Sequence, residues 1–210
     1  MKTGIKKMIM SSRNEILAAI AANKPDYQPL PVGLYTPENG YNIVSRFKEN
    51  ITLIGGAVHK INVISEIEQF LYSNFPSAKR IVTNNEALKN VATHLINTDL
   101  DKQIPHELEN VDVTILDAPF GVAENGAIWI TDESLHHRVL PFITQHLILI
   151  IKESSIIASL QDAYAKIGLT DYGYGTFISG PSKTADIEQS LVIGAHGSRS
   201  LDVFIIGQAS

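Results

Sequence analysis

The arrangement of apolar residues constrains this sequence more than any other feature, because short apolar runs alternate with segments of helical periodicity. The runs have the length of strands and lie at residues 58–63, 80–83, 111–116, 127–131, 146–151 and 203–206. The helical segments repeat apolar residues every three or four positions and lie at 41–47, 65–71, 87–95 and 156–167. Such alternation is typical of α/β domains. We therefore predict a largely parallel sheet flanked by helices.

A different organisation is expected for the N-terminal part of the chain. Ser12 and Glu15 have the spacing of a capping box, and three aliphatic residues follow them at helical intervals. Prolines between residues 25 and 37 then interrupt regular structure, because proline lacks a backbone N–H. We predict an extended or disordered start at 1–10, a helix and proline-rich arm at 11–37, and one α/β domain at 38–210.

Composition excludes several classes of protein. The chain has 210 residues, 44% of them hydrophobic, and its 17 basic and 22 acidic side chains give a net charge of −5. That apolar content is typical of a folded core, and a mildly acidic chain without a long basic run is a poor match for nucleic acid. The longest aliphatic run, Leu147 to Ile151, is far shorter than the roughly 20 residues that span a membrane. We expect a cytoplasmic protein with no membrane span and no nucleic-acid partner.

Sulfur ligands are absent, because the sequence contains no cysteine. Iron–sulfur clusters, thiolate zinc sites and cysteine nucleophiles all need a cysteine side chain. The histidines also lack a spacing that is typical of metal ligands, and the adjacent His136 and His137 would point in different directions on a helix. We predict neither a cluster nor a metal site in this chain, and the sequence does not identify a cofactor.

In sheets of this kind, ligands bind beyond the carboxyl ends of the strands. Three segments have a suitable composition there: Thr83 to Glu86, Asp117 to Gly126, and Ser179 to Glu188. The last of them follows a strand with Gly180-Pro181 and then with hydroxyl and acidic side chains at a potential helix start. Free N–H groups at a helix N-terminus favour an anion, so a phosphate or carboxylate site is one interpretation. A solvated helix cap is the other.

Glu124 precedes Asn125-Gly126 between two predicted strands. A carboxylate that is partly desolvated at such a turn acts as a general acid or base, or as a nucleophile. The alternative is a tight hairpin turn with an exposed glutamate, and the pattern favours it because Asn-Gly is a common hairpin signal.

Two histidines have sequence surroundings that suit a catalytic or ligand-binding role. His146 opens a predicted buried strand, and His196 lies in Gly194-Ala195-His196-Gly197, where glycines let the backbone approach a ligand while the imidazole offers a proton or a hydrogen bond. Structural roles are expected instead for His59, His94 and Trp129, which lie in ordinary strand and helix patterns.

Several of these segments resemble the LUD-domain family, in the branch of the C-type lactate-utilisation proteins. The C-terminal signature corresponds to Ser179 to Glu188 followed by Val192 to Gly197. Gly121 to Gly126 is similar to the family's Ala-Glu-x-Gly segment. The similarity also includes Arg138, Leu140-Pro141 and His146-Leu147, and extends over residues 11–207. Two positions depart from the family pattern, with Ser198 in place of the usual proline and Asn125 in place of threonine or serine.

The resemblance implies a fold of the NagB/RpiA/CoA-transferase-like kind and a bacterial, cytoplasmic role in oxidising L-lactate to pyruvate. It also implies two partner proteins that carry cysteine-rich iron–sulfur segments. The absence of cysteine then means that electrons pass through the partners, while this chain supplies a ligand-binding cleft or an assembly surface. A small ligand that bears a carboxylate or phosphate is expected.

On this hypothesis the candidate residues line one common cleft. The catalytic candidates are Glu124, Arg138, His146 and His196, and the anion-binding candidates are Gly180, Ser182, Thr184 and Asp186. Arg138 would hold a substrate carboxylate, and His146 or His196 would accept the proton of a hydroxyl group. Two alternatives stay open. One is a non-catalytic regulatory or scaffold subunit, and the other is acyl or CoA transfer through Glu124, because Glu124-Asn125-Gly126 also resembles the Glu-Asn-Gly motif of CoA transferases.

Overall fold

The computed structural model describes residues 12–29, 42–95, 104–135, 137–169, 173–187, 190–194 and 196–207. The chain divides into two compact units, residues 1–36 and 37–210. In the first unit, helix α1 (Ser12–Ala22) confirms the helix predicted from the capping box. Its aliphatic residues Ile16, Leu17 and Ile20 are half-exposed or more. The predicted extended start at residues 1–10 lies outside the described residues.

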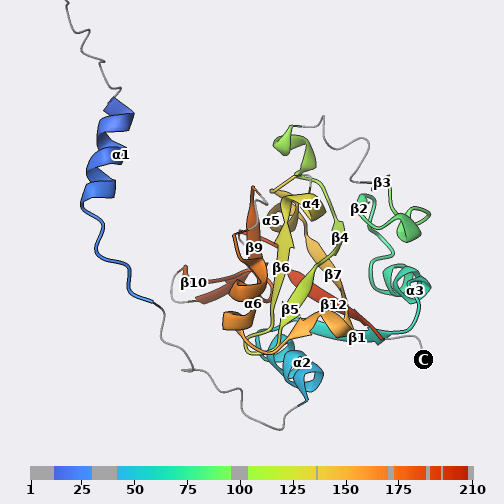
Figure 1. The fold of residues 1–210 in the computed structure, drawn as a ribbon. Coiled ribbons are helices and arrows are strands. Elements are labelled where there is room, and N and C mark those ends of the chain that lie inside the picture. The colour runs from blue at the N-terminus through green and yellow to red at the C-terminus, as the bar shows by residue number, and fades with distance from the viewer. Residues whose placement is uncertain are drawn as a thin grey trace, which may run out of the picture. The chain divides into compact units, whose positions relative to one another are not determined.

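A six-stranded sheet forms the centre of the second unit (Figure 1). Its order is β1 (Ala57–Ile61), β12 (Ser200–Ile206), β7 (His146–Lys152), β4 (Val113–Asp117), β2 (Ile81–Thr83) and β3 (His94–Leu95). Every neighbouring pair runs parallel. This confirms the predicted α/β fold with its mainly parallel sheet.

A second sheet packs against the first. It contains β8 (Ile156–Ile157), β5 (Phe120–Val122), β6 (Ala127–Thr131) and β9 (Gly175–Ile178) in that order. The Asn125-Gly126 turn joins β5 to β6, as the hairpin interpretation predicted. The described residues of this unit also form helices α2 (Ile43–Leu53), α3 (Ser65–Asn74), α4 (Asp132–Leu135), α5 (Leu140–Ile143) and α6 (Leu160–Ile167), and the hairpin of β10 (Lys183–Ile187) and β11 (Ser190–Ile193).

Three apolar clusters hold these layers together. Alternate residues of β7 point to opposite faces, so Leu147, Leu149 and Ile151 pack with α2 and the second sheet, whereas Ile148 and Ile150 pack with α3. A third cluster fills the space between the second sheet and α6. Figure 1 shows α3 and α6 on opposite sides of the two sheets. The second sheet therefore takes the place of a helical layer on one face.

Two predicted helices are wrong. Residues 87–95 form a short 3-10 turn at Glu86–Leu88 and then strand β3, because Asn85 caps only that turn and the chain rejoins the sheet beside β2. The potential helix start after Pro181 is strand β10, in which Lys183 pairs with Ile193 across a hairpin. The backbone of this segment forms the hydrogen bonds of the hairpin, so it offers no helix N-terminus that could bind an anion.

Two further segments differ in detail from the prediction. Residues 156–167 begin as strand β8 before Ser159 caps α6 through a hydrogen bond from the Asp162 N–H at 3.0 Å. Helix α3 forms as predicted, but Ile64 is its N-cap residue and no side chain caps it, so the expected capping by Ser65 and Glu68 is wrong. A carboxylate oxygen of Glu66 accepts hydrogen bonds from the N–H groups of Asn62 and Val63.

Candidate functional site

A cavity of about 360 Å³ lies at the amino-terminal edge of the parallel sheet. Its walls come from the residues that directly precede or open β4, β7 and β12, together with the loop between α3 and β2. The lining residues are Asn74, Phe75, Pro76, Ser77, Ala78, Asp112, Gln145, His146 and Arg199. Among the residues predicted for the site, His146 belongs to this lining. This edge is opposite to the one where the sheet rule places ligands.

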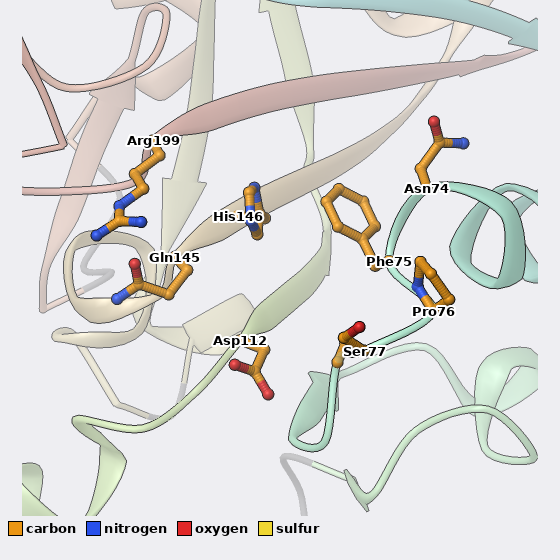
Figure 2. Close-up of a pocket in the computed structure, with 9 residues that line it drawn as sticks. Asn74, Phe75, Pro76, Ser77, Asp112, Gln145, His146 and Arg199 are labelled. Atoms are coloured by element: carbon orange, nitrogen blue, oxygen red, sulfur yellow. The ribbon is translucent and has the colours of Figure 1, made fainter.

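His146 is held in a defined orientation. Its Nδ1 lies 2.8 Å from the Ser200 hydroxyl on the neighbouring strand, and its ring lies 4.6 Å from the Phe75 ring, centre to centre. Figure 2 shows the imidazole between Phe75 and the pair of Gln145 and Arg199. When Nδ1 donates its proton to Ser200, Nε2 is the unprotonated nitrogen and can accept a proton.

The charge state of His146 suits a proton acceptor. Burial lowers its pKa, and Arg199 lowers that pKa further, whereas the carboxylates of Asp202 and Asp112 raise it. The net shift is downward, so the imidazole is neutral at neutral pH. A neutral imidazole accepts the proton of a hydroxyl group, whereas an imidazolium cannot.

Arg199 supplies the positive charge at the cavity. Its backbone N–H donates to the Gln145 carbonyl at 2.8 Å, which anchors the loop beside the start of β7. Its side chain is exposed, and no ion pair of the described residues includes it. Asp112 is already engaged, since it accepts from the N–H groups of Lys79 and Arg80 at 2.7 and 2.9 Å. The guanidinium of Arg199 is therefore the group with which a carboxylate can pair.

The loop that precedes β12 connects this cavity to Ser182. The Ser182 N–H donates to the Ser198 carbonyl at 2.9 Å, and the Gly194 N–H donates to the Ser182 carbonyl at 3.1 Å. A Cβ added to Gly197 would lie 3.0 Å from the Ser182 Cβ, so the loop requires a small residue there. His196 belongs to the same loop and is exposed. Ser182 and His196 thus belong to or contact the loop that carries Arg199, and Arg199 lines the cavity together with His146.

The backbone conformation at Gly180 favours glycine over any other residue. Its φ is +82°, and an added Cβ would lie 2.9 Å from the Ile54 carbonyl oxygen at the end of α2. A side chain at this position would be strained. The side chains of Thr184 and Asp186 lie outside what the structure describes, although their backbone belongs to β10.

Arg138 already has a carboxylate partner. Its Nε and Nη2 donate to the two carboxylate oxygens of Asp132 at 2.9 and 2.8 Å, and the guanidinium lies 5.0 Å from the centre of the Tyr174 ring. These hydrogen bonds hold the pKa of Asp132 below its ordinary value. Arg138 is not part of the cavity that contains His146, and a substrate carboxylate would have to displace Asp132 from it.

Glu124 lies at the exposed β5–β6 turn. One of its carboxylate oxygens accepts from the Leu160 N–H at 2.7 Å, at the first residue of α6. Asn50 of α2 donates to the carbonyl oxygens of Ala123 and Glu124 at 2.7 and 3.0 Å. In this position the carboxylate caps a helix, which matches the exposed-turn interpretation of the sequence.

Sequence reasoning did not select Arg199, Gln145, Asp112 or the loop after α3. One signal was available, because Gln145 directly precedes His146 and Arg199 follows closely after His196-Gly197. Contact between the starts of three strands and the loop after α3 depends on the strand order, which a single sequence does not reveal. Within the described residues, no group of three or more histidine or acidic side chains is placed to hold a metal ion. None of the helices described is long and apolar enough to cross a membrane.

Comparison with known proteins identifies relatives. The model of the LUD domain matches residues 44–206. Lactate utilization protein C of Geobacillus thermodenitrificans is 31% identical over 112 residues, which cover 50% of this chain and 47% of that protein. The Shouchella clausii protein of the same name is 35% identical over 106 residues, 48% of this chain and 46% of its own length. This chain spans about half the length of these two relatives.

Two further similarities extend over most of the chain. Lactate utilization protein C of Deinococcus radiodurans is 24% identical over 196 residues, which cover 90% of this chain and 91% of that protein. A crystal structure of a DUF162 family protein from Deinococcus radiodurans superposes with a TM-score of 0.59 and 17% identity, covering 79% of this chain and 96% of that one. The structural similarity is evidence for a shared fold.

Proposed function

This chain belongs to the LUD-domain family, and from that membership we propose that it serves lactate utilisation as the subunit that binds the hydroxy acid. The observation that carries the proposal is the similarity to lactate utilization protein C of Deinococcus radiodurans over nine-tenths of both chains. The proposed ligand site is the cavity that contains His146 and Arg199.

The chemistry of the cavity supports a small hydroxy acid. The Arg199 guanidinium would pair with the carboxylate of lactate, and the neutral imidazole of His146 would accept the hydroxyl proton. Gln145 adds an amide that can hydrogen-bond the substrate. His196 belongs to the same loop as Arg199, and Ser182 is hydrogen-bonded to that loop, so we propose that both contribute to ligand binding. Arg199 thereby takes the carboxylate-binding role that the sequence suggested for Arg138.

Oxidation of lactate to pyruvate releases two electrons and two protons, and the electrons need an acceptor. Because this chain has no cysteine, it cannot hold an iron–sulfur cluster by itself. We propose that two cysteine-rich iron–sulfur proteins of the bacterial cytoplasm accept the electrons. This chain is assigned orientation of the substrate and removal of the hydroxyl proton by His146, while the proton from the hydroxyl-bearing carbon passes to solvent as the two electrons leave for the partner proteins.

The first experiment measures binding of L-lactate to the full chain by calorimetry and by thermal shift. Arg199→Met should weaken binding by about tenfold or more, because it removes a charge-assisted pair. His146→Gln should weaken L-lactate binding less than Arg199→Met does. It should nevertheless abolish lactate oxidation when the chain is combined with the two iron–sulfur proteins. Arg46→Met is the matched control, since Arg46 is exposed on α2 and does not line the cavity.

Absence of lactate binding by the chain alone and in the assembly would contradict the proposal and favour a scaffold subunit. Equal lactate oxidation by wild type, Arg199→Met and His146→Gln would also contradict it. A ligand at 100 times its Kd stabilises a protein by about 2.7 kcal/mol, so the thermal-shift measurement detects even weak binding at high ligand concentration.

A further inference from the structure

A second cavity lies at the carboxyl-terminal edge of the parallel sheet, opposite the proposed lactate site. It has a volume of about 490 Å³. The lining residues are Asn85, Asp117, Ala118, Pro119, Ser134, Ile150, Ile151, Lys152, Ser155 and Ile206. Most of them follow or end β2, β4, β7 and β12. Two of the three segments that the sheet rule selected, Thr83 to Glu86 and Asp117 to Gly126, contribute to this lining.

Strand register places opposite charges close together in this cavity. Asp117 at the end of β4 pairs with Ile150 of β7, and Lys152 at the end of β7 pairs with Ile206 of β12. Paired residues of neighbouring strands project from the same face, and so do residues two positions apart. The carboxylate of Asp117 and the ammonium of Lys152 therefore project from one face, with Ile150 and Ile206 beside them.

Among the described residues, Asp117 forms its hydrogen bonds with neutral groups. The side-chain amide of Asn85 donates to both carboxylate oxygens at 3.0 Å, and the Asp117 N–H donates to Asn84 at 2.9 Å. Burial raises the pKa of Asp117, although the Asn85 hydrogen bond and the Lys152 charge oppose the shift. No ion pair of the described residues includes Asp117. The carboxylate thus retains acceptor capacity that a ligand can use.

Lys152 provides the complementary group. Its side chain is exposed at the cavity, whereas the neighbouring Lys60 is paired with Glu153 at 2.8 Å. An acceptor at Asp117 and a donor at Lys152 match a ligand that carries a donor next to an acceptor. The remaining lining combines apolar side chains, from Ala118, Pro119 and the isoleucines, with the polar side chains of Asn85, Ser134 and Ser155. The apolar part of the wall matches the face of a flat ring, and the polar groups match its edge.

We propose that this cavity binds a planar heterocycle through a lactam edge, with the ring N–H donating to Asp117 and the adjacent carbonyl accepting from Lys152. The volume accommodates a one- to three-ring system with part of an attached sugar or sugar alcohol. Guanine-type purines and flavins share this edge, whereas adenine does not have it. The site is distinct from the proposed lactate site, because no residue lines both cavities.

The test titrates the full chain with guanosine, riboflavin and adenosine, by calorimetry and, for riboflavin, by its fluorescence. Guanosine or riboflavin should bind saturably and adenosine should not. Saturation by guanosine alone assigns a purine, and saturation by riboflavin alone assigns a flavin. Asp117→Asn and Lys152→Met should each raise the Kd of the bound probe by about tenfold or more.

Matched controls come from the first unit, where Asp26 and Lys24 are exposed. Asp26→Asn and Lys24→Met should leave the Kd unchanged. The proposal fails if neither lactam probe saturates the protein at concentrations on the order of 1 mM, or if adenosine binds as tightly. It also fails if Lys152→Met, whose exposed side chain makes few demands on folding, leaves the Kd unchanged. Lactate binding by Asp117→Asn should match that of wild type, which separates this result from a failure of the lactate site.

Discussion

His146 is the residue whose protonation links the proposed site to the stability of the protein. Its pKa is lowered in the folded state, chiefly by burial. The unfolded chain, in which histidine titrates at about 6.5, therefore binds more protons than the folded chain just below that pH. The contribution of His146 to the free energy of unfolding is therefore highest above the unfolded pKa and falls as the pH drops through that value toward the lowered folded pKa.

The prediction is measured by urea unfolding between about pH 8 and about pH 5. Wild type should lose free energy of unfolding relative to His146→Gln as the pH falls, because glutamine does not titrate. His106→Gln serves as the control, since His106 is exposed outside the cavity, and it should follow the wild-type curve. A difference between wild type and His146→Gln that does not change with pH would contradict the assignment of a lowered pKa.

At the scale of elements, the contact between β5 and α2 depends on the absence of a side chain at Gly121. A Cβ added to Gly121 would lie 2.8 and 2.9 Å from two ring carbons of Phe47, which is fully buried in α2. These distances are too short for carbon atoms, so either the ring or the strand must shift. Gly121 is thus needed for close packing between the second sheet and α2.

Gly121→Ala should lower the free energy of unfolding by about 1–3 kcal/mol, measured by urea unfolding, because overpacking forces a displacement in the core. Gly207→Ala is the control, since its added Cβ would meet no atom closer than 3.5 Å. Adding Phe47→Leu to Gly121→Ala should recover part of the loss, because the smaller side chain leaves room. If the two substitutions are strictly additive, the ring is not the source of the cost.

On the scale of the whole molecule, strands with two apolar faces join the three clusters into one unfolding unit. Alternate residues of β7 belong to the first and second clusters, and β6 contributes Ile128 and Ile130 to the first and Trp129 to the third. Disruption of one cluster therefore displaces a strand that the next cluster needs. Cooperative unfolding of residues 37–210 is the expected consequence.

Leu149→Ala tests this cooperativity, because Leu149 is fully buried in the first cluster, whereas Trp129, the single tryptophan, reports on the third. The substitution should cost about 2–5 kcal/mol. It should shift the tryptophan fluorescence and circular dichroism transitions by the same amount. Leu53→Ala is the control, since Leu53 is 81% exposed and should shift neither. If the fluorescence transition keeps its wild-type midpoint while the circular dichroism transition moves, the clusters unfold separately.

Local patterns predicted much of the fold. The apolar runs at 111–116, 127–131 and 146–151 became β4, β6 and β7, because burial on both faces of a sheet demands apolar residues. Prediction failed where neighbours along the chain do not decide the structure. The segment after Pro181 contains residues that suit a helix cap, yet its partner across the hairpin, β11, makes it a strand.

For the candidate site, too, one part could be predicted from the sequence and another part could not. Sequence by itself determined the α/β class, the absence of a cysteine-bound cluster, and His146 as a residue at the start of a buried strand. Only the tertiary structure decided that Arg199, Gln145 and Asp112 meet His146 at one edge, and that Asp117 and Lys152 meet at the other. The physical reason is that periodicity along the chain sets which face of a strand is buried. The order of parallel strands, which depends on packing between distant segments, sets which strand ends become neighbours.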